Sequence, residues 1–242
     1  MRWAVDGDVV LYSVCFAAKD DPFSFAARSV RVFLENLMAT LNADGIDVYL
    51  TGEGNYRKEL GCDAYPYKGT RKKEKPPHFY EMREYLIENL GAIEINGKEA
   101  DDALATAACQ LGHGIATIDK DLWGVPGWHY NWNKQEVSCV SPEAANRVFY
   151  TQLLSGDSSD NIPGLFKRLG KKVTKKVLEP LDWMTEPTEM YDYVYKVYSE
   201  AYDNVGMCLD DKVKVLDDWL LRQGRQLWMQ RSDGEMWNAP KS

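Results

Sequence analysis

Short apolar runs that alternate with helical repeats constrain the fold of this chain more than any other feature. Runs at 2–5, 47–50, 92–95 and 115–118 have the length and apolar character of buried strands. Apolar residues recur at helical spacing between and beyond them, at 9–18, 24–41, 78–90, 100–111 and 142–154. Parallel strands need helical crossovers of this kind. We therefore predict an α/β fold with a mainly parallel central sheet flanked by helices.

Two segments depart from this alternation. A polar stretch at about 52–77, rich in glycine and lysine, is too long for a simple connection and is typical of a functional or disordered loop. After about residue 160, helical patterns at 190–202 and 212–221 follow one another without strands. We predict an α/β domain over residues 1–160 that carries the loop at about 52–77, and a helical lobe with a C-terminal tail over residues 161–242.

Composition narrows the chemistry. The 242 residues include five cysteines, scattered without a CxxC pair, and three histidines that do not share a helix face. This usage is typical of a reducing cytosol and disfavours a disulfide framework, a zinc site or a Ser-His-Asp centre. No apolar run approaches the roughly 18 residues of a membrane span. We expect a cytoplasmic protein without a membrane partner, in which carboxylates carry any hydrolytic chemistry.

Basic residues are concentrated in two clusters although the net charge is −8. The first is Lys68, Arg71, Lys72, Lys73 and Lys75, and the second is Lys167, Arg168, Lys171, Lys172, Lys175 and Lys176. A single run of this kind is more often a solvated surface than a binding site. Two clusters in an acidic chain favour an extended anionic partner such as nucleic acid.

Acidic residues follow the ends of the predicted strands. They form four groups: Asp6 with Asp8, Glu99 with Asp101 and Asp102, Asp119 with Asp121, and Asp157 with Asp160. Helix capping or turn chemistry explains any one group equally well. Groups beyond the carboxyl ends of parallel strands meet in one crevice, so we expect the first three to converge. Several carboxylates in one crevice need cations, and oxygen ligands without histidine or cysteine select Mg²⁺ or Mn²⁺.

Five motifs resemble, in order and spacing, those of the flap-endonuclease superfamily, which includes the 5′-nuclease domains of bacterial DNA polymerase I. They are VDGD at 5–8, YKGTR at 67–71, EADD at 99–102, DKDL at 119–122 and GDSSDNIPG at 156–164. The segment NYRKEL at 55–60 is most similar to the T-odd phage 5′→3′ exonucleases. The resemblance spans about residues 1–178, and the combination of motifs is more specific than any one of them.

The resemblance implies a nuclease that hydrolyses DNA phosphodiesters with two metal ions and leaves 5′-phosphate products. Its ligands for two Mg²⁺ (or Mn²⁺) ions would be Asp6, Glu99, Asp101, Asp102, Asp119, Asp121, Asp157 and Asp160. Ions in such sites lie about 3.5–4 Å apart and stabilise the attacking and leaving oxygens together. Lys68 and Arg71 would act as catalytic groups that reach the scissile phosphate from the 52–77 segment, the basic arch of this family.

The resemblance also implies how DNA is held. Residues 164–178 resemble the family's helix-three-turn-helix, which binds duplex phosphates and often a K⁺ ion. The DNA-binding residues would be Lys72, Lys73, Lys167, Lys171, Lys172 and Lys175. The implied substrate is duplex DNA with a free 5′ end or a 5′ flap, and the RNA strand of hybrids. We expect a monomer that acts in phage replication or genome degradation within the host cytoplasm, with replication proteins as candidate partners.

Two positions depart from the family pattern. Gly52 stands where the family has an aspartate after the second strand, so that ligand is absent or supplied by Glu53. The loop at 164–170 is one residue longer than usual and lacks the middle glycine. This second departure bears on the K⁺ site more than on duplex binding.

Three other interpretations stay open. Asp6 to Val10 fits the DxDx(V/T) nucleophile motif of haloacid-dehalogenase-type phosphatases, although the acidic motif at 156–160 is one residue short of theirs. An RNA-cleaving PIN-type domain shares the carboxylates but not the basic second lobe. A non-catalytic DNA-structure-binding protein would carry the same basic clusters.

Overall fold

The structure is a computed structural model that describes residues 1–61, 64–71, 74–165, 173–203 and 209–240. The chain forms two compact units. Unit 1 comprises Met1–Asn55, Lys72–Val140 and Met229–Gly234, and unit 2 comprises Tyr56–Arg71, Ser141–Trp228 and Glu235–Ser242. Each unit therefore draws on segments that lie far apart in the sequence.

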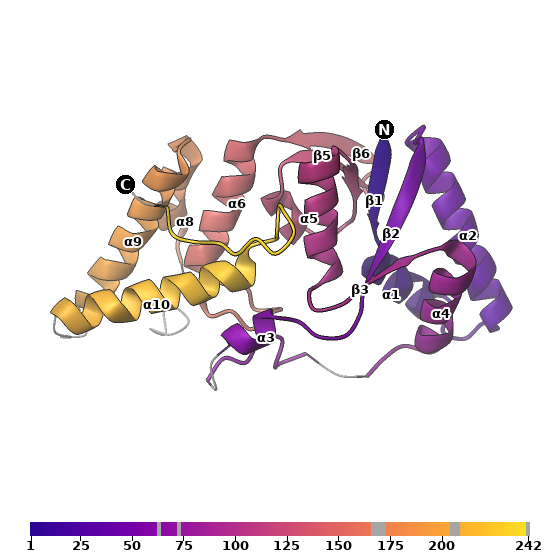
Figure 1. Ribbon diagram of the computed structural model, residues 1–242, viewed down its shortest axis with the longest axis horizontal. Coiled ribbons are helices and arrows are strands. Elements are labelled where there is room, and N and C mark those ends of the chain that lie inside the picture. The colour runs from indigo at the N-terminus through magenta and orange to yellow at the C-terminus, as the bar shows by residue number, and fades with distance from the viewer. Residues whose placement is uncertain (62–63, 72–73, 166–172, 204–208, 241–242) are drawn as a thin grey trace. The chain divides into compact units, whose positions relative to one another are not determined.

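Within the described residues, unit 1 is built on a six-stranded sheet with the order β3-β2-β1-β4-β5-β6 (Figure 1). The strands are β1 (Arg2–Asp6), β2 (Gly45–Thr51), β3 (Ile93–Ile95), β4 (Gly114–Ala116), β5 (Gly127–Asn131) and β6 (Glu136–Val140). Among these six, neighbours pair in parallel except β5 with β6. Val5 of the central strand β1 pairs with Val48 on one side and Ala116 on the other. The predicted α/β fold with a mainly parallel sheet is confirmed.

The helices of unit 1 cover both faces of this sheet. They are α1 (Gly7–Ala17), α2 (Phe23–Thr40), α4 (Phe79–Leu90), α5 (Ala100–Leu111) and the 3₁₀ turn η1 (Asp121–Gly124). Side chains of β1 alternate between the faces: Trp3 and Val5 join the core formed with α1, α2 and α4, whereas Ala4 packs with α5. Because both faces are covered, residues 3–5 of β1 and all of β4 are apolar and buried.

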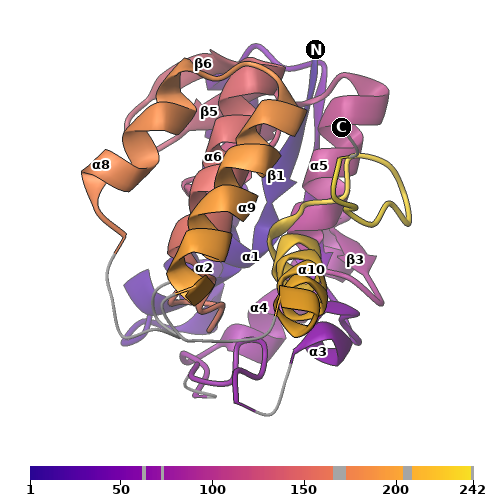
Figure 2. The ribbon, with the colours of Figure 1, turned by 90° about the vertical axis from the view of Figure 1, so that its left-hand side faces the viewer.

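Unit 2 is helical in its described residues. Its elements are α3 (Arg57–Leu60), α6 (Pro142–Ser155), α8 (Lys175–Leu178), η2 (Glu179–Trp183), α9 (Pro187–Asp203) and α10 (Leu209–Leu227). Figure 2 shows α6 and α9 running side by side. The two helices share an aromatic and aliphatic core. The buried hydroxyl of Tyr198 on α9 donates to the Leu153 carbonyl oxygen of α6 (2.7 Å) and accepts from Nε2 of Gln223 on α10 (3.1 Å). One side chain therefore joins three helices.

The boundaries of the two compact units differ from the predicted domain boundary near residue 160. Helix α6, which the prediction places in the α/β domain, packs against α9 and α10 in unit 2. The middle part of the predicted arch, Tyr56–Arg71, also belongs to unit 2. Buried Arg57 donates to the carbonyl oxygens of Gln226 (2.9 Å) and Trp228 (2.6 Å), which lie 169 and 171 residues further along the chain. The functional division near residue 160 stays a prediction.

Most predicted elements begin and end within two residues of the observed ones. Two differ more: α9 begins at Pro187 rather than at residue 190, and α10 spans Leu209–Leu227 rather than 212–221. Helix α10 continues because Gln223 and Gln226, which interrupt its apolar pattern, are buried and hydrogen-bonded. Within the described ranges, none of the helices is both long and apolar enough to cross a bilayer.

Candidate active site

Asp6 lies at the end of β1, where the chain turns directly into α1. Gly7 permits this turn, because a Cβ at this position would lie 2.4 Å from the carbonyl oxygen of Tyr49 on β2. The Asp6 carboxylate caps α1 by accepting from the Val9 backbone N–H (3.0 Å), and it also accepts from the Thr117 hydroxyl (2.7 Å). Asp6 is only 2% exposed. The end of β1 therefore presents a buried carboxylate held from two sides.

Asp8 stands in the first turn of α1 and contacts the end of β2. Its Oδ2 accepts from the Thr51 backbone N–H (3.1 Å). The Thr51 hydroxyl accepts in turn from the Ala100 backbone N–H (2.9 Å) at the start of α5. Thr51 thereby links the starts of α1 and α5, where the first two acidic groups lie.

Three predicted ligands lie at the start of α5. Glu99 is the N-cap and forms a capping box with Asp102, whose Oδ2 accepts from the Glu99 backbone N–H (3.3 Å). Oε1 of Glu99 accepts from Nδ2 of Asn55 (2.8 Å). Asp102 is fully buried, and its Oδ1 accepts from the Gln230 backbone N–H (3.0 Å). Asp101 is half-buried in the first turn. The capping role is present here, and the metal-binding role of these residues stays a prediction.

Asp119 and Asp121 follow β4 in a tight turn. The Asp119 backbone N–H donates to the Thr117 hydroxyl oxygen (2.9 Å), and the Asp121 backbone N–H donates to Oδ1 of Asp119 (2.9 Å). The Thr117 hydroxyl also donates to Asp6, so one side chain joins the end of β1 to the turn after β4. The parallel pairing of β1 with β4 places these two strand ends side by side.

The buried carboxylates of unit 1 repel one another. The pKa of Asp6 is raised from 3.8 to about 7, chiefly by burial and also by the charges of Asp8 and Asp119, against the lowering effect of its hydrogen bonds. The pKa of Asp8 is also raised, mainly by burial, with a contribution from the charge of Glu99. The acidic groups of β1, α5 and β4 therefore lie within electrostatic reach of one another.

These carboxylates suit a divalent cation by their chemistry. They offer hard oxygen donors, and a nearby dication would offset both their burial and their mutual repulsion. As placed, no three His, Cys, Asp or Glu side chains among the described residues come close enough to enclose an ion. Oxygens of Asp6 and Asp8 accept hydrogen bonds from backbone N–H groups. Ion binding would therefore require some of these side chains to turn.

Asp157 and Asp160 lie in a closed turn of unit 2. The backbones of Asp157 and Ile162 pair through two hydrogen bonds (2.8 and 2.7 Å). Gly156 adopts a φ of +73°, and a Cβ there would lie 2.4 Å from the Ile162 carbonyl oxygen, so the turn requires glycine. Oδ1 of Asp157 accepts from the backbone N–H and the hydroxyl of Ser159 (both 2.6 Å). The GDSSDNIPG motif thus closes on itself.

Asp160 contacts both predicted catalytic cations. Arg71 forms an ion pair with its Oδ1, Nζ of Lys68 lies 3.8 Å from its Oδ2, and the Tyr67 hydroxyl donates to the same oxygen (2.6 Å). The Lys68 backbone N–H also donates to the Asp160 carbonyl oxygen (2.8 Å). The YKGTR and GDSSDNIPG motifs therefore form one constellation within unit 2.

Several predicted DNA-binding residues lie outside the described residues, namely Lys72, Lys73, Lys167, Lys171 and Lys172. The same holds for most of the loop at 164–170, on which the K⁺ prediction rests. Lys175 opens α8 and is exposed. Its role in DNA binding stays a prediction.

The structure gives a steric reason for the missing aspartate after β2. A Cβ on Gly52 would lie 2.2 Å from Oδ1 of Asn96. That oxygen accepts from the Glu53 backbone N–H (2.7 Å), and the Gly52 N–H donates to the Ile95 carbonyl oxygen (2.7 Å). Asn96 thus occupies the space that a side chain at residue 52 would need. The side chain of Glu53 is exposed, and its role as a substitute ligand stays a prediction.

Four residues that contact the carboxylates of unit 1 from distant parts of the chain were not among the predicted site residues. They are Thr51, Asn55, Thr117 and Gln230. Thr51 and Thr117 share a readable signal, since each is a hydroxyl residue at the carboxyl end of an apolar run. Gln230 lies 128 residues from Asp102, and its contact leaves no local pattern.

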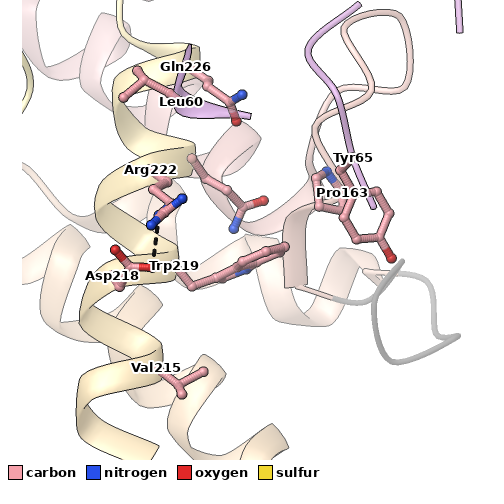
Figure 3. A pocket seen from close by; sticks show the side chains of 9 residues that line it. Leu60, Tyr65, Pro163, Val215, Asp218, Trp219, Arg222 and Gln226 are labelled. Atoms are coloured by element: carbon pink, nitrogen blue, oxygen red, sulfur yellow. Dashed lines mark ion pairs between the residues drawn. The ribbon is translucent and has the colours of Figure 1, made fainter. Parts of the chain in front are cut away.

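A separate cavity of about 370 Å³ lies in unit 2 beside α10 (Figure 3). Tyr65 and Trp219 are arranged edge to face there, with ring centroids 6.2 Å apart, and Nε of Arg222 pairs with Asp218 at 2.8 Å. None of the predicted site residues that the structure describes lines this cavity. Burial and charge, rather than cavity size, therefore mark the candidate site.

Comparisons with known proteins give a match in structure but not in sequence. No protein-family model matches the chain, and no curated protein matches it. Bacteriophage T5 5′-exonuclease with divalent metal ions (zinc) bound has a TM-score of 0.53 at 17% identity, over 93% of this chain and 100% of that one. The catalytic core of Rad2 in complex with DNA substrate has a TM-score of 0.54 at 14% identity, over 99% and 83%. This chain has the 5′-nuclease fold.

The flap endonuclease of bacteriophage T5, in a pseudo-enzyme–product complex with DNA and metal ions, has the same 5′-nuclease fold. Its TM-score is 0.51 at 17% identity, over 90% of this chain and 98% of that one. The predicted resemblance to the flap-endonuclease superfamily is thereby confirmed at the level of the fold. In this 5′-nuclease fold, the acidic groups of unit 1 stand at the carboxyl ends of β1 and β4 and at the start of α5.

Proposed function

We propose that this chain is a divalent-metal-dependent 5′→3′ exonuclease and flap endonuclease that hydrolyses DNA phosphodiesters to 5′-phosphate products. The observation that carries the proposal is the set of buried, mutually repelling carboxylates in unit 1. Carboxylates whose pKa values are raised by burial and like charge are typical of functional sites. The choice of substrate is supported by the likeness to structures described as a 5′-exonuclease, as a flap endonuclease and as a catalytic core with DNA substrate.

The carboxylates would hold two Mg²⁺ (or Mn²⁺) ions. The proposed ligands are Asp6, Glu99, Asp101, Asp102, Asp119, Asp121, Asp157 and Asp160. When bound, the ions would supply an activated water and charge stabilisation for in-line displacement at the phosphate. Thr117 and Thr51 hold the strand ends and helix starts from which these side chains project. Such outer contacts restrict the ligands before an ion binds.

Lys68 and Arg71 are the proposed phosphate-binding groups. Arg offers a planar fork for two phosphate oxygens, and Lys supplies a compact positive charge. Both cations pair with Asp160 in the structure. A phosphate that attracts them would weaken those ion pairs and leave the Asp160 carboxylate for a metal ion. Substrate binding and ligand availability would therefore be coupled through Asp160.

Duplex phosphates would be held by the remaining predicted cations. These are Lys72, Lys73, Lys167, Lys171, Lys172 and Lys175. Each neutralised phosphate releases counterions, so affinity should fall with salt at a log–log slope of about −0.9 per contact. The proposal includes a K⁺ ion bound within residues 164–178, action on the RNA strand of hybrids, and a monomeric cytoplasmic protein that works with replication proteins.

The deciding experiment compares 5′- and 3′-labelled duplex DNA and 5′-flap DNA, digested with Mg²⁺ and with EDTA. Asp121→Asn should lower cleavage by roughly three orders of magnitude, because charge stabilisation by a metal ion is worth several kcal/mol. DNA binding in EDTA should survive. Asp20→Asn is the matched control, since the Asp20 side chain is 87% exposed. Near-normal turnover of Asp121→Asn would refute the assignment.

The same experiment separates the alternatives. Binding of ended DNA without cleavage in any divalent metal would favour a non-catalytic DNA-structure-binding protein, and cleavage restricted to single-stranded RNA would favour a PIN-type nuclease. A phosphatase with Asp6 as nucleophile leaves Glu99 and Asp119 without a role, although both contribute charge to the same site. An acid-stable phosphoaspartate at Asp6 would nevertheless establish it.

A further inference from the structure

The C-terminal segment Met229–Gly234, here called the C-terminal strap, belongs to unit 1 although the helix before it belongs to unit 2. In Figure 1 this yellow segment runs beside α5. Met229 packs into the apolar cluster that contains Ala100, Leu104 and Ala108 of α5. The C-terminal strap therefore contacts α5, the helix whose start carries the EADD motif.

Gln230 makes the central contacts of the strap. Its backbone N–H donates to Oδ1 of Asp102 (3.0 Å), and its carbonyl oxygen accepts from the Thr106 hydroxyl (2.9 Å). Its side-chain Oε1 accepts from Nζ of Lys98 and from the Gly234 backbone N–H (both 3.3 Å). The residue is 4% exposed. Gln230 thus contacts Lys98, which precedes the EADD motif, Asp102, which ends it, and Thr106 in the next turn of α5.

Other strap residues contact both acidic elements. Arg231 donates through Nη2 to the Gly124 carbonyl oxygen (3.2 Å) at the end of η1, the turn that Asp121 opens. The Arg231 carbonyl oxygen accepts from Nε2 of Gln110 on α5 (3.2 Å). Asp233 forms an ion pair with Lys98. The strap therefore joins α5 to η1. Four of the proposed ligands lie at the starts of these two elements, namely Glu99, Asp101, Asp102 and Asp121.

The bond to Asp102 matters because that carboxylate is fully buried. Its Oδ2 accepts from the Glu99 backbone N–H, and its Oδ1 accepts from the strap. A hydrogen bond to an ionised acceptor is stronger than a neutral one, and a buried acceptor that loses its donor bears the full desolvation penalty. Without the strap, Asp102 would be expected to turn away from its present orientation.

We propose that the C-terminal strap positions the EADD motif for divalent-cation binding, with the Gln230 backbone N–H fixing the carboxylate of Asp102. This inference rests on the proposed function of the same carboxylates. Gln230 is a positioning residue, since it acts through Asp102 and not on the substrate. Partners of this kind affect metal affinity by about 10- to 100-fold when they are removed.

The test measures Mn²⁺ binding directly, by electron paramagnetic resonance of the free ion, on full-length protein without DNA. Gln230→Pro removes the N–H that Asp102 accepts and should weaken Mn²⁺ binding about tenfold. Gln230→Ala keeps that N–H and should weaken binding by less than about threefold. Thr106→Val removes the hydroxyl that contacts the carbonyl oxygens of Gln230 and Asp102 but leaves the Asp102 carboxylate and its donors in place, and it should also weaken binding. Asp20→Asn is the control, because the Asp20 side chain lies outside the strap and is 87% exposed, and this variant should bind as the wild type does.

Cleavage supplies the second readout. In Gln230→Pro the Mn²⁺ concentration for half-maximal cleavage should rise by the same factor, while the rate at saturating Mn²⁺ recovers, which a general loss of folding would not produce. Should Gln230→Pro fail to fold, Thr106→Val decides by the same measurements. Wild-type Mn²⁺ affinity in folded Gln230→Pro or Thr106→Val would overturn the strap inference, whatever the protein cleaves. Weakened Mn²⁺ binding in a protein that cuts no DNA would support the strap inference and refute the proposed function.

Discussion

Replacement of Asp6 by asparagine should abolish cleavage and yet stabilise the metal-free protein at alkaline pH. The pKa of Asp6 is about 7 in the folded protein, chiefly because burial penalises the charged carboxylate, and its ordinary value is 3.8. Between these two pH values the folded state holds a proton that the unfolded state has released. The contribution of Asp6 to stability therefore falls as pH rises through this window and is constant above it.

The size of the effect follows from the same two values. The difference between 3.8 and about 7 is about 3 pH units, which corresponds to about 4 kcal/mol. Asp6→Asn removes this penalty because the amide is neutral at every pH. Asparagine offers one acceptor oxygen for the two donors, Val9 N–H and Thr117 hydroxyl, so about 1–2 kcal/mol is lost again. The net gain of about 2–3 kcal/mol at alkaline pH raises Tm by roughly 5–10 °C in a chain of this size.

The assay is thermal and urea denaturation of wild type and Asp6→Asn in EDTA, at about pH 5.5 and about pH 8. The excess unfolding free energy of the variant over the wild type should grow by about 2 kcal/mol between these conditions. The reason is that about half of the interval from pH 3.8 to about pH 7 lies above pH 5.5. Comparison of the two proteins at each pH removes the contribution of other groups. Mg²⁺ should stabilise the wild type and leave the variant unchanged. A variant less stable than the wild type at pH 8 in EDTA would refute the reasoning from burial.

Three further predictions test the contacts around the carboxylates. Thr117→Val leaves the Asp119 N–H without its acceptor and should cost about 1–3 kcal/mol of unfolding free energy. In the wild type the Thr117 hydroxyl lowers the pKa of Asp6, so the pKa should rise further in Thr117→Val. The stability difference between acid and alkaline pH in EDTA should therefore widen, and an unchanged difference would count against this role of Thr117. Gly52→Ala should destabilise unit 1 by about 1–3 kcal/mol in urea denaturation, because its Cβ meets Asn96 at 2.2 Å; wild-type stability would show that Asn96 moves freely. Lys68→Ala should slow single-turnover cleavage more than it weakens DNA affinity, and equal losses in both would contradict a role in the chemical step.

Much of the α/β framework was predictable from local pattern. The apolar runs that become β1 and β4 are buried on both faces, so their composition indicates strands without reference to the rest of the chain. Helix α5 begins and ends at the predicted residues, Ala100 and Leu111, because Glu99 caps its start and Gly112 ends it in the left-handed region. The acidic groups were predictable for the same reason, since each follows an element whose end is marked locally.

Long-range contacts were not predictable in this way. The pairing of Arg57 with the carbonyl oxygens of Gln226 and Trp228 places part of the predicted arch in unit 2, and no residue near Arg57 indicates it. The ion pairs of Lys68 and Arg71 with Asp160 are also tertiary, so the sequence indicates three charged residues but not their mutual contact. Whether any two such groups meet depends on the packing of intervening helices.

The sequence by itself determined which residue types stand at the strand ends and helix starts of unit 1, because period, capping and turn chemistry act over a few residues. Only the tertiary structure decided how those residues are used. The hydroxyl of Thr117 reaches Asp6 across 111 residues, and the N–H of Gln230 reaches Asp102 across 128. The raised pKa of Asp6 likewise arises from burial and from neighbouring charges that strand pairing brings close. Such energies depend on distance in space, which separation along the chain does not encode.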